Sequence, residues 1–148
     1  MSQYQQILVP VDESPISYSA VEHALSLAKS QNAQVTIVSV VAVDPFVGVD
    51  FYAVAPAITE YFMQAEKSAQ LRLEDIKQTF VRDGIEVKTR LIHGVSPTEG
   101  ILQVADEISA DLIIMGSHGR TGLKKAMLGS VAQNILTQCL IPVLIIKQ

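Results

Sequence analysis

Short runs rich in apolar, β-branched residues alternate along the chain with longer segments in which apolar residues recur at helical spacing. The short runs have the length of buried strands, and they cover residues 7–11, 35–41, 87–92, 112–115 and 143–146. In such a β-α-β-α-β-α-β-α-β order, each helix carries the chain back to the start of the next strand, so the strands run parallel. The alternation therefore predicts an α/β fold, a doubly wound open sheet of five parallel strands with helices on both faces.

Capping residues and apolar spacing mark the helices between these strands. The predicted helices cover residues 15–29, 58–80, 97–108 and 130–139. Ser14-Pro15 opens the first helix, and Ser96-Pro97-Thr98-Glu99 is a capping box with proline in the first helical position. The second helix is the longest and its pattern ends at Gly84. Residues 43–56 contain two prolines and a glycine without a clear period, so we predict a loop there.

The composition narrows the cellular setting and the classes of function. A chain of 148 residues that is 49% hydrophobic has the size of one well-filled domain, which we expect to span residues 1–148. Cys139 is the single cysteine, the first basic residue is Lys29, and no apolar run approaches the roughly 18 residues of a membrane span. We therefore expect a cytoplasmic protein that is not bound to membranes. The net charge of −4 argues against a nucleic-acid partner.

The charge is unevenly distributed along the chain. Residues 116–130 contain Arg120, Lys124 and Lys125 and no acidic residue, so the rest of the chain has eight basic against fifteen acidic residues, a net charge of −7. A local cationic segment in an acidic protein indicates a small anionic partner. The alternative is an ordinary solvated surface loop, which charge alone does not exclude.

The same segment is rich in glycine and connects a strand to a helix. Gly116 and Gly119 would let backbone N–H groups approach phosphate oxygens, and Gly129-Ser130 would place free amides, a hydroxyl group and the positive end of a helix dipole together. The segment lacks the Gly-Lys-Ser/Thr sequence of a Walker loop, and it does not follow the first strand as a dinucleotide fingerprint would. The glycines either bind an anion or simply allow the chain to turn.

The spacing Gly116-x2-Gly119-x9-Gly129-Ser130 resembles the ATP-binding motif of the universal stress protein family. The resemblance covers essentially the whole chain. It includes the strands Ile7-Leu8-Val9-Pro10-Val11-Asp12, Asp111-Leu112-Ile113-Ile114-Met115-Gly116 and Pro142-Val143-Leu144-Ile145-Ile146, and the helix start Gly129-Ser130-Val131-Ala132. It implies a fold like that of the adenine nucleotide alpha hydrolases and a homodimeric, ATP-binding regulatory or stress-response module. Mg²⁺ would then bridge the phosphates of the bound ATP.

The resemblance also implies which residues bind the nucleotide. The predicted binding residues are Pro10, Val11, Asp12, Val40, Met115, Gly116, Gly119, Arg120, Gly129, Ser130 and Val131. The residues at the ends of the first two strands, with Met115, would hold the base and ribose, and the glycines, Ser130 and Val131 would hold the ribose and phosphates. Arg120 matches a variable position of the family, so its assignment rests on charge alone. Asp12 has a second interpretation, since it could instead cap the helix that starts near Ser14.

The candidate site provides little support for efficient catalysis. We find no Walker lysine, no convincing in-line base and no nucleophile beside a general base, so no catalytic residue is predicted. Two alternatives to a regulatory ATP-binding protein remain open: slow Mg²⁺-dependent ATP hydrolysis, and binding of an adenylate such as AMP without turnover. A phospho-receiver domain would need an acceptor aspartate where this chain has Ile92-His93-Gly94.

The last predicted strand belongs at an edge of the sheet. Residues 141–146 are apolar on both faces, and a bare strand edge of this kind invites pairing with another chain. The resemblance to the universal stress proteins also implies pairing of this strand across a two-fold axis. We therefore expect a homodimer with Val143 to Ile146 at its centre.

Overall fold

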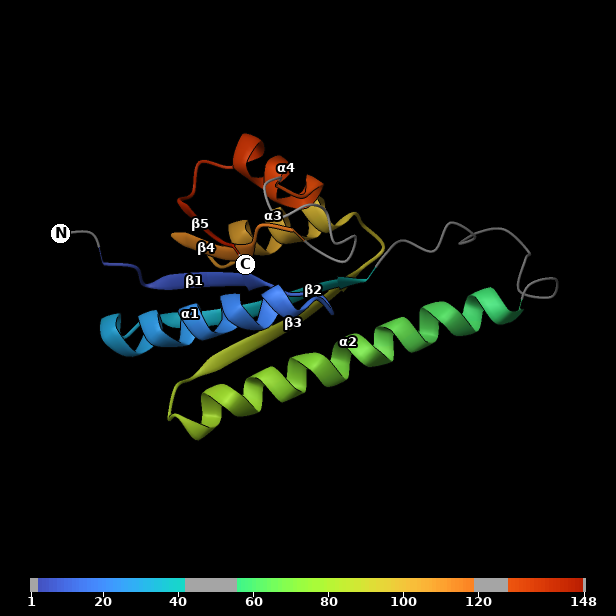
Figure 1. Cartoon of the computed structure of the whole chain (residues 1–148), viewed down its shortest axis with the longest axis horizontal. Coiled ribbons are helices and arrows are strands. Elements are labelled where there is room, and N and C mark those ends of the chain that lie inside the picture. The colour runs from blue at the N-terminus through green and yellow to red at the C-terminus, as the bar shows by residue number, and fades with distance from the viewer. Residues whose placement is uncertain (1–2, 42–55, 119–127, 148) are drawn as a thin grey trace.

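The five strands form one parallel sheet in the order β3-β2-β1-β4-β5 (Figure 1). The computed structural model describes residues 3–41, 56–118 and 128–147. The elements are β1 (Gln6–Pro10), α1 (Pro15–Gln31), β2 (Gln34–Val41), α2 (Pro56–Arg82), β3 (Val87–His93), α3 (Pro97–Glu107), β4 (Leu112–Gly116), α4 (Ser130–Gln138) and β5 (Val143–Ile146). The predicted strands and helices are all present, within a few residues of their expected bounds. The predicted fold class is confirmed.

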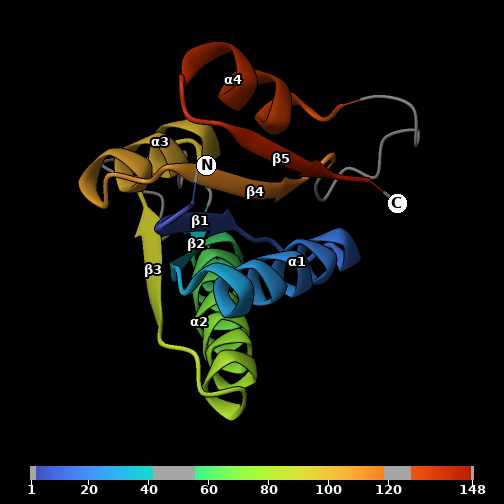
Figure 2. The ribbon, with the colours of Figure 1, turned by 90° about the vertical axis from the view of Figure 1, so that its left-hand side faces the viewer.

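The helices cover the two faces of the sheet in pairs. Helices α1 and α2 lie on one face, and α3 and α4 lie on the other (Figure 2). The chain first moves from β1 outwards to β2 and β3, then returns across the sheet to β4 and β5. The strand order therefore reverses between β1 and β4, where open parallel sheets bind their ligands.

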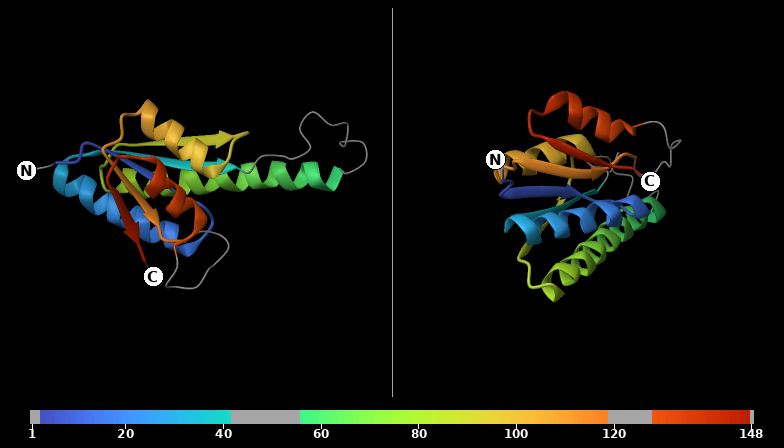
Figure 3. Two further views of the ribbon diagram at one scale, coloured as in Figure 1. Left: turned by 90° about the horizontal axis from the view of Figure 1, so that it is seen from above. Right: turned by 60° about the vertical axis from the view of Figure 1, so that its left-hand side comes forward.

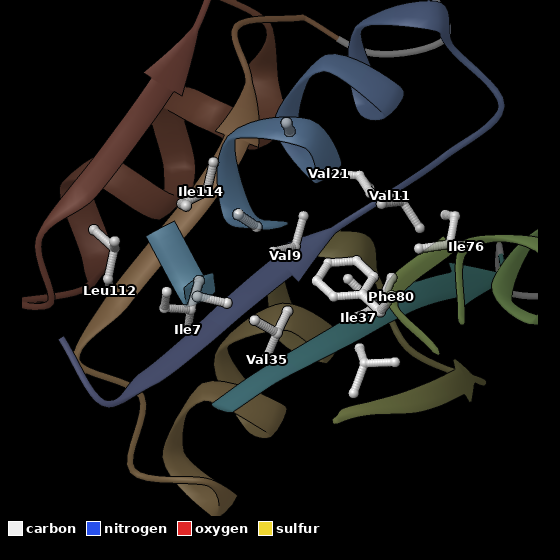
Figure 4. Close-up of a cluster of buried hydrophobic side chains, with 14 of the residues drawn as sticks. Ile7, Val9, Val11, Val21, Val35, Ile37, Ile76, Phe80, Leu112 and Ile114 are labelled. Carbon is white, nitrogen blue, oxygen red and sulfur yellow. The ribbon is translucent and has the colours of Figure 1, made fainter. Parts of the chain in front are cut away.

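Strand β1 is buried on both faces. Ile7 and Val9 belong to the cluster beneath α1 and α2, whereas Leu8 belongs to the cluster beneath α3 and α4. Figure 4 shows the first cluster, in which Phe80 from α2 packs near Ile37 from β2, both with no exposed surface. Truncating a buried phenylalanine such as Phe80 costs about 3–5 kcal/mol, so this packing holds α2 on the sheet.

Helix α2 is the longest of the described helices, and in Figure 3 its N-terminal part runs past the end of the sheet. It ends at Arg82, and Gly84 follows with a φ of +72°, a conformation that favours glycine. The predicted loop at 43–56 falls almost entirely outside the described residues, and Pro56 is the first residue of α2. Among the described helices, none combines the length and the apolar composition needed to cross a membrane.

Candidate functional site

A cavity of about 250 Å³ opens at the carboxyl ends of β1, β2 and β4. It is lined by Pro10, Val11, Asp12, Ser17, Val38, Val40, Pro97, Ile101, Met115, Gly116, His118, Gly129, Ser130, Val131 and Ala132. Nine of the eleven residues that the sequence predicts for nucleotide binding line this cavity. The other two, Gly119 and Arg120, lie outside the described residues, as do Lys124 and Lys125.

One end of the cavity is apolar. Val38 and Val40 of β2 contribute to this end, and so do Pro97 and Ile101 of α3, the helix packed beside them. Met115 of β4 is also part of the lining and is only 5% exposed. An apolar, concave wall of this kind suits a flat ring system, which loses its contact with water when it binds.

The other end of the cavity is the N-terminus of α4. Gly129 is the capping residue, with φ −68° and ψ 162°, and it provides no side-chain cap. The first turn of α4 contains no acidic residue. Because the first N–H groups of a helix have no carbonyl partner within it, those of Ser130 and Val131 point out of the helix beside the positive end of its dipole. This end of the cavity suits an anion.

Backbone hydrogen bonds hold this helix start against the sheet. The N–H of Gly129 donates to the carbonyl oxygen of Ser117 at 2.7 Å, and the N–H of Ser117 donates to the carbonyl oxygen of Ile146 in β5 at 2.8 Å. The two bonds connect β5, the end of β4 and the start of α4 in one row. They also bring Ser117 and Gly129 close together beside the cavity.

Asp12 lines the cavity and also organises the start of α1. Its Oδ1 accepts hydrogen bonds from the backbone N–H of Ser14 at 2.8 Å, from the Ser14 hydroxyl and from the Ser17 hydroxyl at 3.0 Å. Its own N–H donates to Ser17 Oγ at 2.9 Å. The carboxylate therefore stabilises the beginning of α1, as the alternative interpretation of the sequence held, while it remains part of the cavity wall.

Gly116 has a packing role that the sequence did not reveal. It is the last residue of β4, and a Cβ atom at this position would lie 2.7 Å from Cγ2 of Ile16 in α1. Real Cβ atoms essentially never come so close to another atom. A glycine is thus required for α1 to approach the sheet, independently of any contact between the Gly116 backbone and a ligand.

Six residues of the lining were not among the predicted binding residues. They are Ser17, Val38, Pro97, Ile101, His118 and Ala132. Val38 could have been found from its position two residues before Val40, because alternate residues of a strand share a face. His118 follows the end of β4, and its Nδ1 lies 3.2 Å from Ser117 Oγ. In the described part of the chain, His, Cys, Asp and Glu form no group of three or more that could hold a metal ion.

Comparison with known proteins places the chain in a family. Residues 3–147 match the family model described as the universal stress protein family. The chain belongs to the universal stress protein family. The universal stress protein MJ0531 of Methanocaldococcus jannaschii is 35% identical over 98% of this chain and 83% of its own length. YxiE of Bacillus subtilis, also a universal stress protein, is 32% identical over 97% of this chain and 99% of its own length.

Solved structures of universal stress proteins share the same fold. The structure of MJ0577, also from M. jannaschii, superposes with a TM-score of 0.84 at 30% identity, covering 99% of this chain and 98% of that one. A universal stress protein solved in complex with cAMP has a TM-score of 0.65 at 25% identity, covering 99% and 98% of the two chains. The second structure shows that one relative binds a cyclic adenine nucleotide.

Proposed function

We propose that this universal stress protein binds ATP in the cavity at the ends of β1, β2 and β4 and acts as a nucleotide-dependent regulatory or stress-response module. One observation carries the proposal. A single cavity joins an apolar wall, which suits a base, to the N-terminus of α4, which suits phosphates. The complex of a relative with cAMP supports an adenine nucleotide as the ligand.

The phosphates are proposed to lie at Gly129, Ser130 and Val131, with Mg²⁺ bridging their oxygens. Asp12 provides the only carboxylate in the described lining, and its Oδ1 already accepts hydrogen bonds from Ser14 and Ser17. The donor set thus fits an ion held mainly by phosphate oxygens, since Mg²⁺ commonly binds through substrate phosphates and few protein groups. The basic residues of the 116–130 segment would add positive charge to this end.

A regulatory role is favoured over rapid catalysis because the sequence has no Walker lysine and no nucleophile beside a general base. The polar side chains of the described lining are Asp12, Ser17, His118 and Ser130. Slow Mg²⁺-dependent hydrolysis is tested by phosphate release, and turnover above roughly one per second would indicate a true enzyme. Binding of AMP without turnover is the other alternative, and competition between AMP and ATP for the same protein distinguishes the two ligands.

We also propose that the protein is a homodimer joined through β5. This strand lies at the edge of the sheet and pairs with β4 on one side only. Leu144 is 38% exposed on β5, and Leu140, just before it, is fully exposed. Size-exclusion chromatography with light scattering is expected to give twice the chain mass, and a monomer at micromolar concentration contradicts the dimer. We place the protein in the cytoplasm, where the thiol of Cys139 would stay reduced.

The nucleotide proposal is tested with freshly purified protein. Mass spectrometry of the denatured protein is expected to detect a released adenine nucleotide, and calorimetry with MgATP to show binding. Gly129→Val puts a branched side chain at the start of α4 and is expected to abolish binding while the circular dichroism spectrum stays native. The proposal predicts the same loss for Gly119→Val. Absence of both binding heat and released nucleotide from the parent protein counts against an ATP-binding function.

A further inference from the structure

Helix α3 contains a buried glycine that faces the sheet. Gly100 lies in the second turn of the helix, and a Cβ atom built on it would lie 2.7 Å from Cγ2 and 3.2 Å from Cγ1 of Val40. The Ile92 side chain would be 3.3 Å away. The helix therefore rests directly on two side chains of β2 and β3 at this point, with no room for a methyl group between them.

Glycine is a poor choice for a helix interior, because it loses more backbone freedom on folding than alanine does. The backbone of Gly100 is in an ordinary helical conformation, so no positive φ requires a glycine there. What the glycine permits is the close approach of α3 to Val40. That approach has a consequence for the cavity, because Val40 and two residues of α3, Pro97 and Ile101, all line its apolar end.

The overlap between a methyl group at position 100 and Val40 would be relieved most easily if the Val40 side chain moved toward the cavity. The β2 backbone pairs with β3 at Val40 and with β1 as far as Val38, so both pairings oppose a movement of the strand. The Val40 side chain is half-buried and has the open cavity on one side. A methyl group added to α3 would therefore push the Val40 methyl groups into the space that a base would occupy.

We propose that Gly100 is a positioning residue that sets the width of the apolar end of the cavity and thereby its preference for a purine over a pyrimidine base. Gly100 touches no ligand itself and acts through Val40. The inference rests on the proposed nucleotide function. A purine has two fused rings and needs the full width, whereas the single ring of a pyrimidine tolerates a narrower pocket.

The test compares ATP and UTP, each with Mg²⁺, on the parent protein and on Gly100→Ala. ATP affinity is measured by calorimetry, and UTP affinity by displacement of bound ATP. Gly100→Ala is expected to weaken ATP binding about tenfold and UTP binding less than about threefold, because a methyl group forced into a packed contact displaces its neighbours. In a Val40→Ala background, where the contact is removed, Gly100→Ala is expected to leave the ratio of the two affinities unchanged. Gln103→Ala, on the exposed side of the same helix, is the matched control and is expected to change neither affinity.

The outcomes separate this inference from the function on which it rests. A parent protein that binds no ATP overturns both. A parent that binds ATP, with a Gly100→Ala variant that keeps the parental ratio or loses both nucleotides equally, overturns the inference alone. If Gly100→Ala does not fold, Val40→Ile adds a methyl group to the same contact from the other side, and it must lower the ratio of ATP to UTP affinity. An unchanged ratio in the folded Val40→Ile variant also overturns the inference.

Discussion

Helices α3 and α4 lie side by side on one face of the sheet and both begin at the cavity, yet their N-termini are built differently. At α3, Ser96 Oγ accepts a hydrogen bond from the N–H of Glu99 at 3.2 Å, Pro97 removes a further N–H, and Glu99 adds a negative charge to the first turn. At α4, the capping residue Gly129 provides no side-chain cap, and the first turn contains no acidic residue. The N-terminus of α3 is thus capped by its own residues, whereas none of the described side chains is shown to cap α4.

The comparison shows how one cavity acquires two unlike ends. A capped, acidic helix start repels phosphate, so α3 contributes only the apolar Pro97 and Ile101 to the wall. An uncapped helix start beside it attracts phosphate. The orientation of a nucleotide in the cavity would then depend on which of the two helix starts is capped. No charged side chain of the described lining would be needed to determine that orientation.

The largest effect is expected when α4 receives a cap of its own. In Gly129→Asp, the carboxylate would bond to the free N–H groups of the first turn and repel phosphate, so ATP affinity should fall about 100-fold or more. The free energy of unfolding should stay within a few tenths of a kcal/mol of the parent value, because Gly and Asp are both acceptable capping residues. Calorimetry and thermal denaturation measure the two quantities.

Gly129→Asn is the matched control for this change, because it has the same shape and caps equally well but is uncharged. We expect a loss of about tenfold, which represents the occupied N–H groups without the charge repulsion. Equal losses for Asp and Asn would show that the occupied N–H groups or the added volume, and not charge, exclude the ligand. Full ATP affinity in both variants would show that the phosphates do not lie at α4.

A smaller effect is expected when the cap of α3 is removed, and it should concern stability and not ATP affinity. Ser96→Ala leaves the N–H of Glu99 without its hydroxyl acceptor, and the free energy of unfolding should fall by about 1 kcal/mol. ATP affinity should change by less than about twofold, since the phosphates are proposed to bind at α4 and not at this helix start. Urea denaturation and calorimetry are the measurements, and Ser30→Ala, at an exposed serine near the end of α1, is the control. Loss of ATP affinity without loss of stability would contradict the contrast between the two helices.

The position of the candidate site agrees with two general rules. Parallel strands place their carboxyl ends at one edge, and the glycine spacing marks the segment that begins α4. The individual residues were predicted from the resemblance to the universal stress proteins, and nine of them line one cavity. Element order, helix caps and apolar periods are local properties, so the fold was equally accessible from the sequence.

The contribution of α3 to the cavity could not be predicted from the sequence in the same way. A capping box predicts where a helix begins, but not which neighbour that helix start will face. Pro97 and Ile101 reach the cavity because the chain crosses the sheet between β3 and β4, and the close fit of Gly100 against Val40 depends on the distance between two elements. The packing of Gly116 on Ile16 is likewise a contact between segments a hundred residues apart in sequence, which no local pattern reports.

The smallest effect concerns the other end of α3, where an ion pair joins Glu107 to Arg90 of β3. Arg90 in β3 donates to Glu107 Oε2 at 2.7 Å and Gln103 donates to Oε1 at 3.2 Å. These hydrogen bonds, from Arg90 first and then Gln103, lower the pKa of Glu107 in the folded protein below its ordinary value of 4.5. A carboxyl group with a lowered pKa stabilises the fold above its unfolded pKa, and the contribution is lost as the pH falls through the folded value.

Glu107→Gln should therefore melt slightly below the parent at pH 7, and the difference should shrink as the pH is lowered from 5 toward 3. Added salt should also reduce it, because the ion pair is exposed to solvent. Thermal denaturation at several pH values measures the difference, with Asp106→Asn at the neighbouring exposed carboxylate as the control. A difference that grows on acidification would mean that Glu107 is stabilised in its protonated form, and that the ion pair with Arg90 does not secure the C-terminal end of α3.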